Sequence, residues 1–149
     1  MFDIESRSSE LITINTKKTS VTFNMSDYSI SGKISVGSIS GPGEFEIGDV
    51  TIRGIAVSGN RTIYDAEVGG VHVGVIGEIE EGLDDLGVSD ILCTSSVRAI
   101  REIDPKVIIP MGNVDAMITE LKLSAKTESK YKVKSLDSLP VAKEIVMLK

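Results

Sequence analysis

The fold of this chain is indicated most clearly by the stretch Gly41-Pro42-Gly43-Glu44-Phe45-Glu46-Ile47-Gly48-Asp49-Val50-Thr51-Ile52-Arg53-Gly54-Ile55. Its first three residues predict a tight turn, because glycine permits positive φ angles and proline fixes its own φ. Gly48-Asp49 is a two-residue hairpin signal between two runs that contain alternating apolar residues. The stretch therefore predicts a turn followed by two antiparallel strands.

The residues on both sides of this stretch extend the strand pattern through the first half of the chain. Apolar residues alternate or cluster in short runs over residues 10–15, 20–24, 34–39, 55–58, 61–68 and 71–76. Residues 16–19 predict a polar turn, and Gly69-Gly70 predicts a second hairpin. Residues 25–32 are polar and rich in serine, and carry weak signals of ordered structure. We expect a meander of antiparallel strands here.

The period of the apolar pattern changes after Gly77. Residues 90–94 and 107–110 are short, continuous apolar runs typical of buried strands. Ser95-Ser96 predicts the cap of a helix that ends near Ile103, and Asn113 or Asp115 predicts the start of another. Residues 131–134 and 144–148 predict closing strands. The predicted class is α/β (α+β), with a β-rich N-terminal half.

Length and composition predict one domain over residues 1–149, with 41% hydrophobic and 26% charged residues. The net charge of −6 opposes binding to a phosphate backbone, so we expect no nucleic-acid partner. The basic run 126–134 predicts a solvated edge strand or turn. No apolar run approaches the roughly 20 residues of a membrane helix, and the N-terminus does not resemble a signal peptide. We therefore expect no membrane association and a cytoplasmic location.

Taken together, these segments resemble the metallo-β-lactamase-fold hydrolases, particularly their ascorbate-lactonase-like branch. The resemblance is carried in chain order by residues 41–55, 62–64 with 70–77, 83–92, 103–111, and 132–148 with its Leu139-Pro140 break. It covers most of residues 34–149, and residues 11–24 fit the family's opening strands. It implies a β-sandwich flanked by helices, truncated here, and a family activity of metal-dependent hydrolysis.

The resemblance does not extend to the metal ligands. The family's His-x-His-x-Asp-His signature should follow the strand that ends near residue 24, but residues 24–34 contain no histidine and offer only Asp27. Glu78 stands where the second ligand region has aspartate, and Gly112 where the third has histidine. The single histidine of the chain, His72, lies within a predicted strand. A lone histidine cannot build a metal site, so we predict a half-buried or cross-strand role for it.

We interpret the chain as a catalytically degenerate metallo-β-lactamase-like protein that acts as a structural, oligomerising or binding module. This predicts no cofactor and no catalytic or metal-binding residue, with Glu78 and Asp27 as vestigial candidates. The alternative is a residual metal-dependent hydrolase with an altered carboxylate-based site, whose candidate donors would also include Asp49, Glu44 and Cys93.

Two of these features admit a simpler interpretation as well. The acidic run 78–85 fits either a hard-cation site or a solvated loop beside a helix N-terminus. Cys93 lies in an apolar strand, which predicts a buried and unreactive thiol.

The short connection between residues 24 and 34 also predicts an uncovered sheet face. The family's sandwich carries helices on both sheets, and this connection is too short for the metal motif and its helix. Wide apolar faces do not stay in water, so we expect a second copy of the chain or another protein partner to cover the face.

Overall fold

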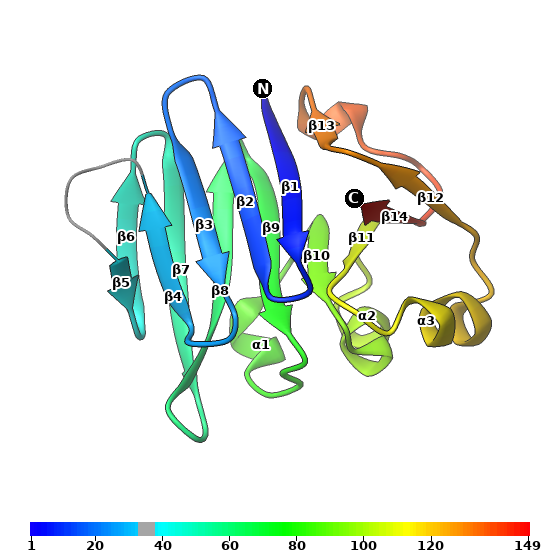
Figure 1. The fold of residues 1–149 in the computed structure, drawn as a ribbon, viewed down its shortest axis with the longest axis horizontal. Helices are drawn as coiled ribbons and strands as arrows, with labels where there is room; N and C mark the ends of the chain where they lie inside the picture. Colours follow the sequence, from blue (N-terminus) through cyan, green and yellow to red (C-terminus); the bar gives the residue numbers. More distant parts are fainter. Residues whose placement is uncertain (33–37) are drawn as a thin grey trace.

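Two β-sheets packed face to face make up most of the molecule (Figure 1), in a computed structural model that describes residues 1–32 and 38–149. The first sheet is antiparallel and has the strand order β13-β1-β2-β3-β4-β5. Its strands are β1 (Phe2–Ser8), β2 (Leu11–Thr16), β3 (Ser20–Asn24), β4 (Ser29–Gly32), β5 (Ser38–Ser40) and β13 (Tyr131–Val133). The N-terminal strand thus pairs with a strand from the C-terminal part of the chain.

The second sheet is mixed and has the strand order β12-β14-β11-β10-β9-β8-β7-β6. Its antiparallel part is the predicted meander, and the pairs from β9 to β12 are parallel. The strands are β6 (Gly43–Ile47), β7 (Val50–Val57), β8 (Arg61–Val68), β9 (Val71–Gly77), β10 (Ile91–Thr94), β11 (Val107–Pro110), β12 (Ala125–Glu128) and β14 (Glu144–Leu148). The hairpins predicted at Gly48-Asp49 and Gly69-Gly70 join β6 to β7 and β8 to β9, which confirms both.

Close backbone approach explains the glycine near the end of the stretch 41–55. A Cβ atom on Gly54 would lie 2.9 Å from the carbonyl oxygen of Gly41 and 3.1 Å from Cε1 of Tyr64. The turn at residues 41–43 therefore folds back onto β7, over the buried ring of Tyr64, and only glycine fits beneath it. The predicted residues Ile34 and Val36 lie outside the described part of the chain.

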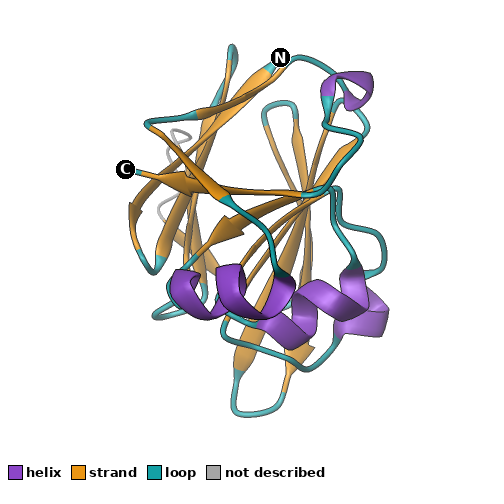
Figure 2. Ribbon diagram, turned by 90° about the vertical axis from the view of Figure 1, so that its right-hand side faces the viewer, coloured by secondary structure: helices purple, strands orange, loops and turns teal. Residues whose placement is uncertain are grey.

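The helices are short and lie beside the second sheet. They are α1 (Leu83–Leu86), α2 (Val97–Ile103) and α3 (Val114–Leu121), whereas the 3₁₀ turn η1 (Leu136–Ser138) follows β13 and lies apart from them (Figure 2). Helix α1 contacts β8, α2 contacts β10, and Figures 1 and 2 show α1 to α3 gathered at the same end of the sandwich. The predicted cap of α2 is confirmed, because Ser96 Oγ accepts a hydrogen bond from the Ala99 amide at 3.0 Å. None of these helices is long and apolar enough to cross a membrane, among the residues described.

The core between the sheets is aliphatic, as the low aromatic content predicts. The apolar residues that alternate along β1 to β4 are buried, and Phe23 of β3 packs on Tyr64 of β8 with ring centroids 5.5 Å apart. Strands β9 and β10 are buried almost throughout, because the second sheet is covered by the first sheet on one face and by helices on the other.

The outer face of the first sheet is polar, which differs from the apolar face expected from the sequence. Thr13 and Thr22 share a hydrogen bond of 2.8 Å between their hydroxyl groups across β2 and β3. Asn15 donates to Asp3 at 2.8 Å and accepts from Ser20 at 2.7 Å. No helix covers this face in the described part of the chain, but its Thr, Asn and Ser side chains form hydrogen bonds there. A partner that covers this face stays a prediction, but the face is polar, so an exposed apolar surface no longer gives the reason for it.

Two strands, β1 and β4, were missed. Residues 2–8, for which no strand was expected, form β1, and part of the serine-rich segment 25–32 forms β4. The basic run 126–134 lies in β12 and β13, which are the edge strands of the two sheets, so the edge-strand interpretation is confirmed. Lysines on such edges discourage pairing with another chain.

Candidate functional site

The ends of β3, β9, β10 and β11 meet at the edge of the sandwich where the resemblance places the metal site. Thr94 and Ser95, at the end of β10, both donate to the carbonyl of Gly77, at 2.7 Å from the Thr94 hydroxyl and 3.0 Å from the Ser95 amide. The Met111 amide donates to the Thr94 carbonyl at 2.9 Å. These bonds hold the last residues of three neighbouring parallel strands in one row.

Methionines fill this edge. Met25 follows β3 directly, and its Cβ lies 3.5 Å from the point where a Cβ on Gly77 would be, so its side chain packs against the end of β9. Met25 and Met111 are both at least nine-tenths buried, at 9% and 5% exposure. The chain thus places flexible apolar side chains, with thioether sulfurs as their only weak acceptors, beside the strand ends.

The two carboxylates proposed as vestigial ligands lie at this edge but are exposed. Asp27 lies in the turn between β3 and β4, where Oδ1 accepts hydrogen bonds from the Ser29 amide at 3.1 Å and the Ser29 hydroxyl at 2.6 Å. Asp27 therefore shapes its own turn. Glu78 follows β9 and points into solvent. In residues 1–32 and 38–149, no three His, Cys, Asp or Glu side chains gather in a way that could hold a metal ion.

The other candidate donors lie elsewhere. Glu44 is exposed on the edge strand β6, and Asp49 lies in the β6–β7 turn, where it accepts a hydrogen bond of 2.6 Å from Thr16. Cys93 is completely buried within β10, and burial raises the pKa of its thiol. A thiol in that state is a poor nucleophile and a poor metal ligand. The structure does not bring these three residues together with Asp27 and Glu78.

The acidic run 78–85 is tied to neighbouring polar groups. Glu80 accepts a hydrogen bond from the Ser96 hydroxyl that caps α2. Glu81 accepts from the amide and hydroxyl of Ser58 and pairs with Arg61 at 3.0 Å, and these contacts, the Ser58 bonds first, lower the pKa of its carboxyl. Each contact has a structural role at the β7–β8 hairpin or at a helix start. The solvated-loop interpretation accounts for them.

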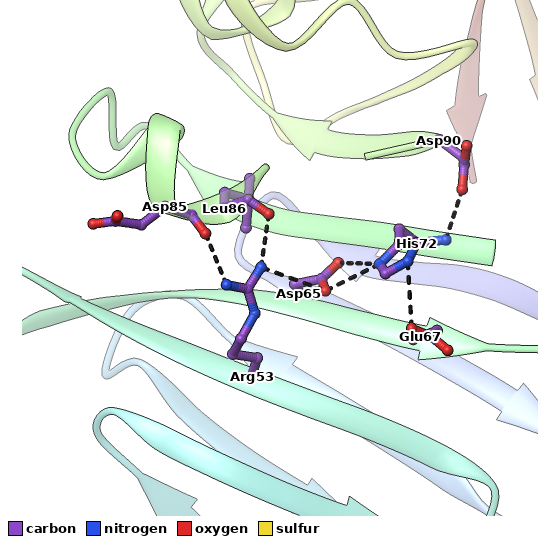
Figure 3. Close-up of polar contacts among 7 residues, drawn as sticks. All are labelled: Arg53, Asp65, Glu67, His72, Asp85, Leu86 and Asp90. Atoms are coloured by element: carbon purple, nitrogen blue, oxygen red, sulfur yellow. Dashed lines mark hydrogen bonds and ion pairs between the residues drawn. The ribbon is translucent and has the colours of Figure 1, made fainter. Parts of the chain in front are cut away.

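A charged network that the sequence analysis missed lies on the helix-side face of the second sheet (Figure 3). Its centre is His72 of β9, with Nδ1 3.1 and 3.2 Å from the carboxylate oxygens of Asp65 and Nε2 3.3 Å from Glu67. The His72 amide donates to Asp90 at 2.8 Å. Since both ring nitrogens face carboxylates of the same sheet, the predicted cross-strand role of this half-buried histidine is confirmed.

Arg53 extends the network to helix α1. Its guanidinium donates to the carbonyls of Asp85 and Leu86 at 2.8 Å each and lies 3.8 Å from the carboxylate of Asp65. A cation at the end of a helix satisfies carbonyls that have no partner within the helix. Asp65 is 5% exposed, and this burial raises the pKa of its carboxyl, although His72 and Arg53 act in the opposite direction.

Sequence signals for this network did exist. The Gly69-Gly70 turn fixes the register of β8 and β9, so that Glu67 faces His72 directly. The next hairpin places Arg53 opposite Asp65. Alternation along the strands then brings all four side chains to one face.

Comparison with known structures identifies the fold. A protein from Thermotoga maritima, proposed to be a Zn-dependent hydrolase of the metallo-β-lactamase superfamily, superposes with a TM-score of 0.72 over 100% of both chains, at 15% sequence identity. The chain has the metallo-β-lactamase fold. The metallo-β-lactamase-fold protein YhfI from Bacillus subtilis aligns with a TM-score of 0.44 at 11% identity, over 74% of this chain and 52% of YhfI. No protein-family profile and no curated protein sequence matches the chain.

The zinc ion implied by this fold does not fit the residues present. A catalytic zinc site needs about three protein donors converging at about 2 Å, supplied by His, Asp, Glu or Cys. At the strand ends of this metallo-β-lactamase-fold chain, Met25 packs against Gly77, Met111 is buried, and position 112 is a glycine. None of these residues supplies one of those donor side chains. The hydrolase-like architecture is therefore present, and in residues 1–32 and 38–149 it lacks the usual donor set.

Proposed function

We propose that this protein is a catalytically degenerate metallo-β-lactamase-fold protein, which serves as a structural or binding module and does not hydrolyse substrates through a bound metal. The observation that carries the proposal is Met25, whose side chain packs against Gly77 at the strand ends. In this fold a metal activates the attacking water, so the loss of its ligands removes the nucleophile itself.

The carboxylates at this edge support the same proposal. Asp27 is engaged by Ser29, and Glu78 is exposed. Two exposed carboxylates favour weak and hydrated cations over a catalytic zinc. Because the Thermotoga maritima protein shares 15% of its residues, its proposed zinc-dependent hydrolysis is not transferred to this chain.

Metal analysis of the purified protein tests the proposal. After exposure to zinc, manganese and iron(II) and removal of excess ions, mass spectrometry should find less than about 0.1 metal ion per chain, since the strand ends lack a converging donor set. Lactone and phosphodiester hydrolysis should then equal the rate of buffer alone. The Glu78→Ala and Asp27→Ala variants are the matched controls.

One metal ion per chain with hydrolysis would overturn the proposal. If the same metal and activity disappeared in the Glu78→Ala variant, the carboxylate-based hydrolase would replace it. Metal that is retained in both variants and supports no hydrolysis would instead indicate adventitious surface binding, and the proposal would stand.

A further inference from the structure

A groove of about 400 Å³ lies beside the strand-end edge, between the β1–β2 turn and the ends of β11 and β14. One wall consists of residues 6–9, and the other of residues 110, 112, 114 and 147–149. Figure 1 shows the β1–β2 turn next to the loop that leaves β11. A Cβ on Gly112 would meet no atom within 4 Å, so the groove is open at this residue. A space of this size suits a small molecule.

The wall formed by the β1–β2 turn is cationic and polar. Arg7 is exposed and lines this wall together with Ser6, Ser8 and Ser9. Ser6 Oγ donates to the Ser8 carbonyl at 2.9 Å, and Ser8 Oγ accepts from the Glu10 amide at 3.2 Å. None of the groove-lining residues in the described chain is an aspartate or glutamate. The protein as a whole carries a net charge of −6, whereas the described side chains that line this groove include bases and no acid.

Within residues 1–32 and 38–149 Arg7 makes no ion pair, and the nearest acid on its strand, Glu5, is engaged by Lys130 at 3.2 Å. The pKa of the Glu5 carboxyl is lowered most by its contact with Lys130, and less by the charge of Arg7. The groove at the β12–β13 corner differs, because its Lys126 already pairs with Glu144 at 3.3 Å. A guanidinium with five free donors beside hydroxyl groups suits a carboxylate or another oxyanion.

The opposite wall is apolar. Pro110, Val114, Met147 and Leu148 form most of it, and each is partly exposed towards solvent, while the exposed Lys149 stands at its end. When an apolar molecule covers partly exposed aliphatic side chains, the free energy of binding becomes more favourable by about 25 cal/mol for each Å² of apolar surface removed from water. The groove thus has a charged wall and an apolar wall that face each other.

We propose that this groove binds a small molecule with an anionic head and a short apolar body, of the class of medium-chain carboxylates. Arg7 receives the anionic head, with the hydroxyls of Ser8 and Ser9 as further donors, and Val114 and Met147 receive the apolar body. This site goes beyond the proposed function, because it uses neither the strand-end carboxylates nor any metal. The result of the metal analysis therefore neither supports nor contradicts this site.

Nuclear magnetic resonance titration of the ¹⁵N-labelled protein tests the site. We use sodium hexanoate as the probe, with sodium acetate for the head alone, 1-hexanol for the body alone and sodium chloride for ionic strength. Hexanoate should shift the amides of Ser8, Ser9 and Val114 saturably. Acetate and hexanol should bind at least about fivefold more weakly, since each lacks one of the two contacts.

Matched arginine variants decide whether the charge at position 7 matters. The Arg7→Gln variant should bind hexanoate about as weakly as the wild type binds hexanol, while Arg98→Gln, on the exposed face of α2, should bind it like the wild type. The amide spectrum shows that each variant is folded. Shifts spread over the whole surface, shifts reproduced by sodium chloride, or unchanged hexanoate affinity in Arg7→Gln would each overturn the proposal.

Discussion

Gly54 shows how a single residue holds the turn at residues 41–43 against the sheet. A methyl group at this position would approach the Gly41 carbonyl to 2.9 Å and Thr62 Cγ2 to 3.2 Å. Both neighbours are fixed, the first as backbone and the second as a buried side chain, so the strain cannot relax by moving a flexible chain end.

We expect Gly54→Ala to lower the free energy of unfolding by about 2 kcal/mol, because overpacking of a filled site costs about 1–3 kcal/mol. Urea unfolding followed by circular dichroism measures the change. Thr51→Ala is the control, since Thr51 is exposed on the same strand and its loss should change stability by less than about 0.5 kcal/mol. Equal urea midpoints for the two variants would contradict this account of the turn.

Asp65 makes a pH-dependent contribution to stability. Burial raises the pKa of its carboxyl in the folded protein, so the folded state holds this proton more tightly than the unfolded state does. The stabilisation from the neutral carboxyl is therefore complete below the unfolded pKa and is lost as the pH rises through the raised folded pKa. Three charged groups face this carboxyl. His72 and Arg53 reduce the loss of stability and Glu67 adds to it, but together they do not reverse its direction.

The Asp65→Asn variant, which stays neutral, should gain stability relative to the wild type between about pH 4 and about pH 7. Urea unfolding of both proteins at the two pH values measures this difference. Asp84→Asn, at an exposed position of α1, serves as the control for loss of one carboxylate. If the free energy of unfolding of the wild type instead rose relative to that of Asp65→Asn with increasing pH, ion pairing would outweigh burial at this site.

At the scale of elements, the turn between β3 and β4 replaces the segment that carries metal ligands in the family. It is fixed from below by Tyr64 of β8, whose buried hydroxyl donates to the Tyr28 carbonyl. Tyr28 itself has a φ of +60°, a conformation that costs a residue with a side chain free energy and needs such support. One hydrogen bond therefore joins the second sheet to the turn.

We expect Tyr64→Phe to lower the free energy of unfolding by about 1–2 kcal/mol, because the Tyr28 carbonyl loses its partner in the interior. Hydrogen exchange should accelerate at the amides of residues 25–30 more than elsewhere. Tyr131→Phe is the control, since the Tyr131 hydroxyl has no hydrogen-bond partner in the described part of the chain. Equal exchange profiles in the two variants would mean that the turn is held by other contacts, with Met25 the first to examine.

For the whole molecule, the parts that the sequence predicted correctly depend on local interactions. Gly48-Asp49, Gly69-Gly70 and Ser96 specify hairpins and a helix cap through the geometry of neighbouring residues, and the structure has each of them. Strand β1 was missed although it forms a local hairpin with β2, because Phe2 and Ile4 are its only apolar residues and its other partner, β13, comes from the C-terminal part of the chain. The packing of Met25 against Gly77 depends in the same way on two segments that only the folded sandwich brings together.

The outer face of the first sheet leads to a prediction about whether the chain associates with a second copy of itself. Its described side chains at β1 to β3 are Ser, Thr, Asn and acidic groups, several of them already bonded to one another, and such a surface lacks the aromatic and aliphatic anchors that dominate stable interfaces. Light scattering should therefore find a monomer at about 10 μM, below the concentration at which a polar contact of this kind associates. Thr22→Arg, at the centre of the face, should leave that result unchanged. A stable dimer in the wild type that dissociates in Thr22→Arg would show that a second copy covers this face through polar contacts, as the shortened connection at residues 24–34 predicts.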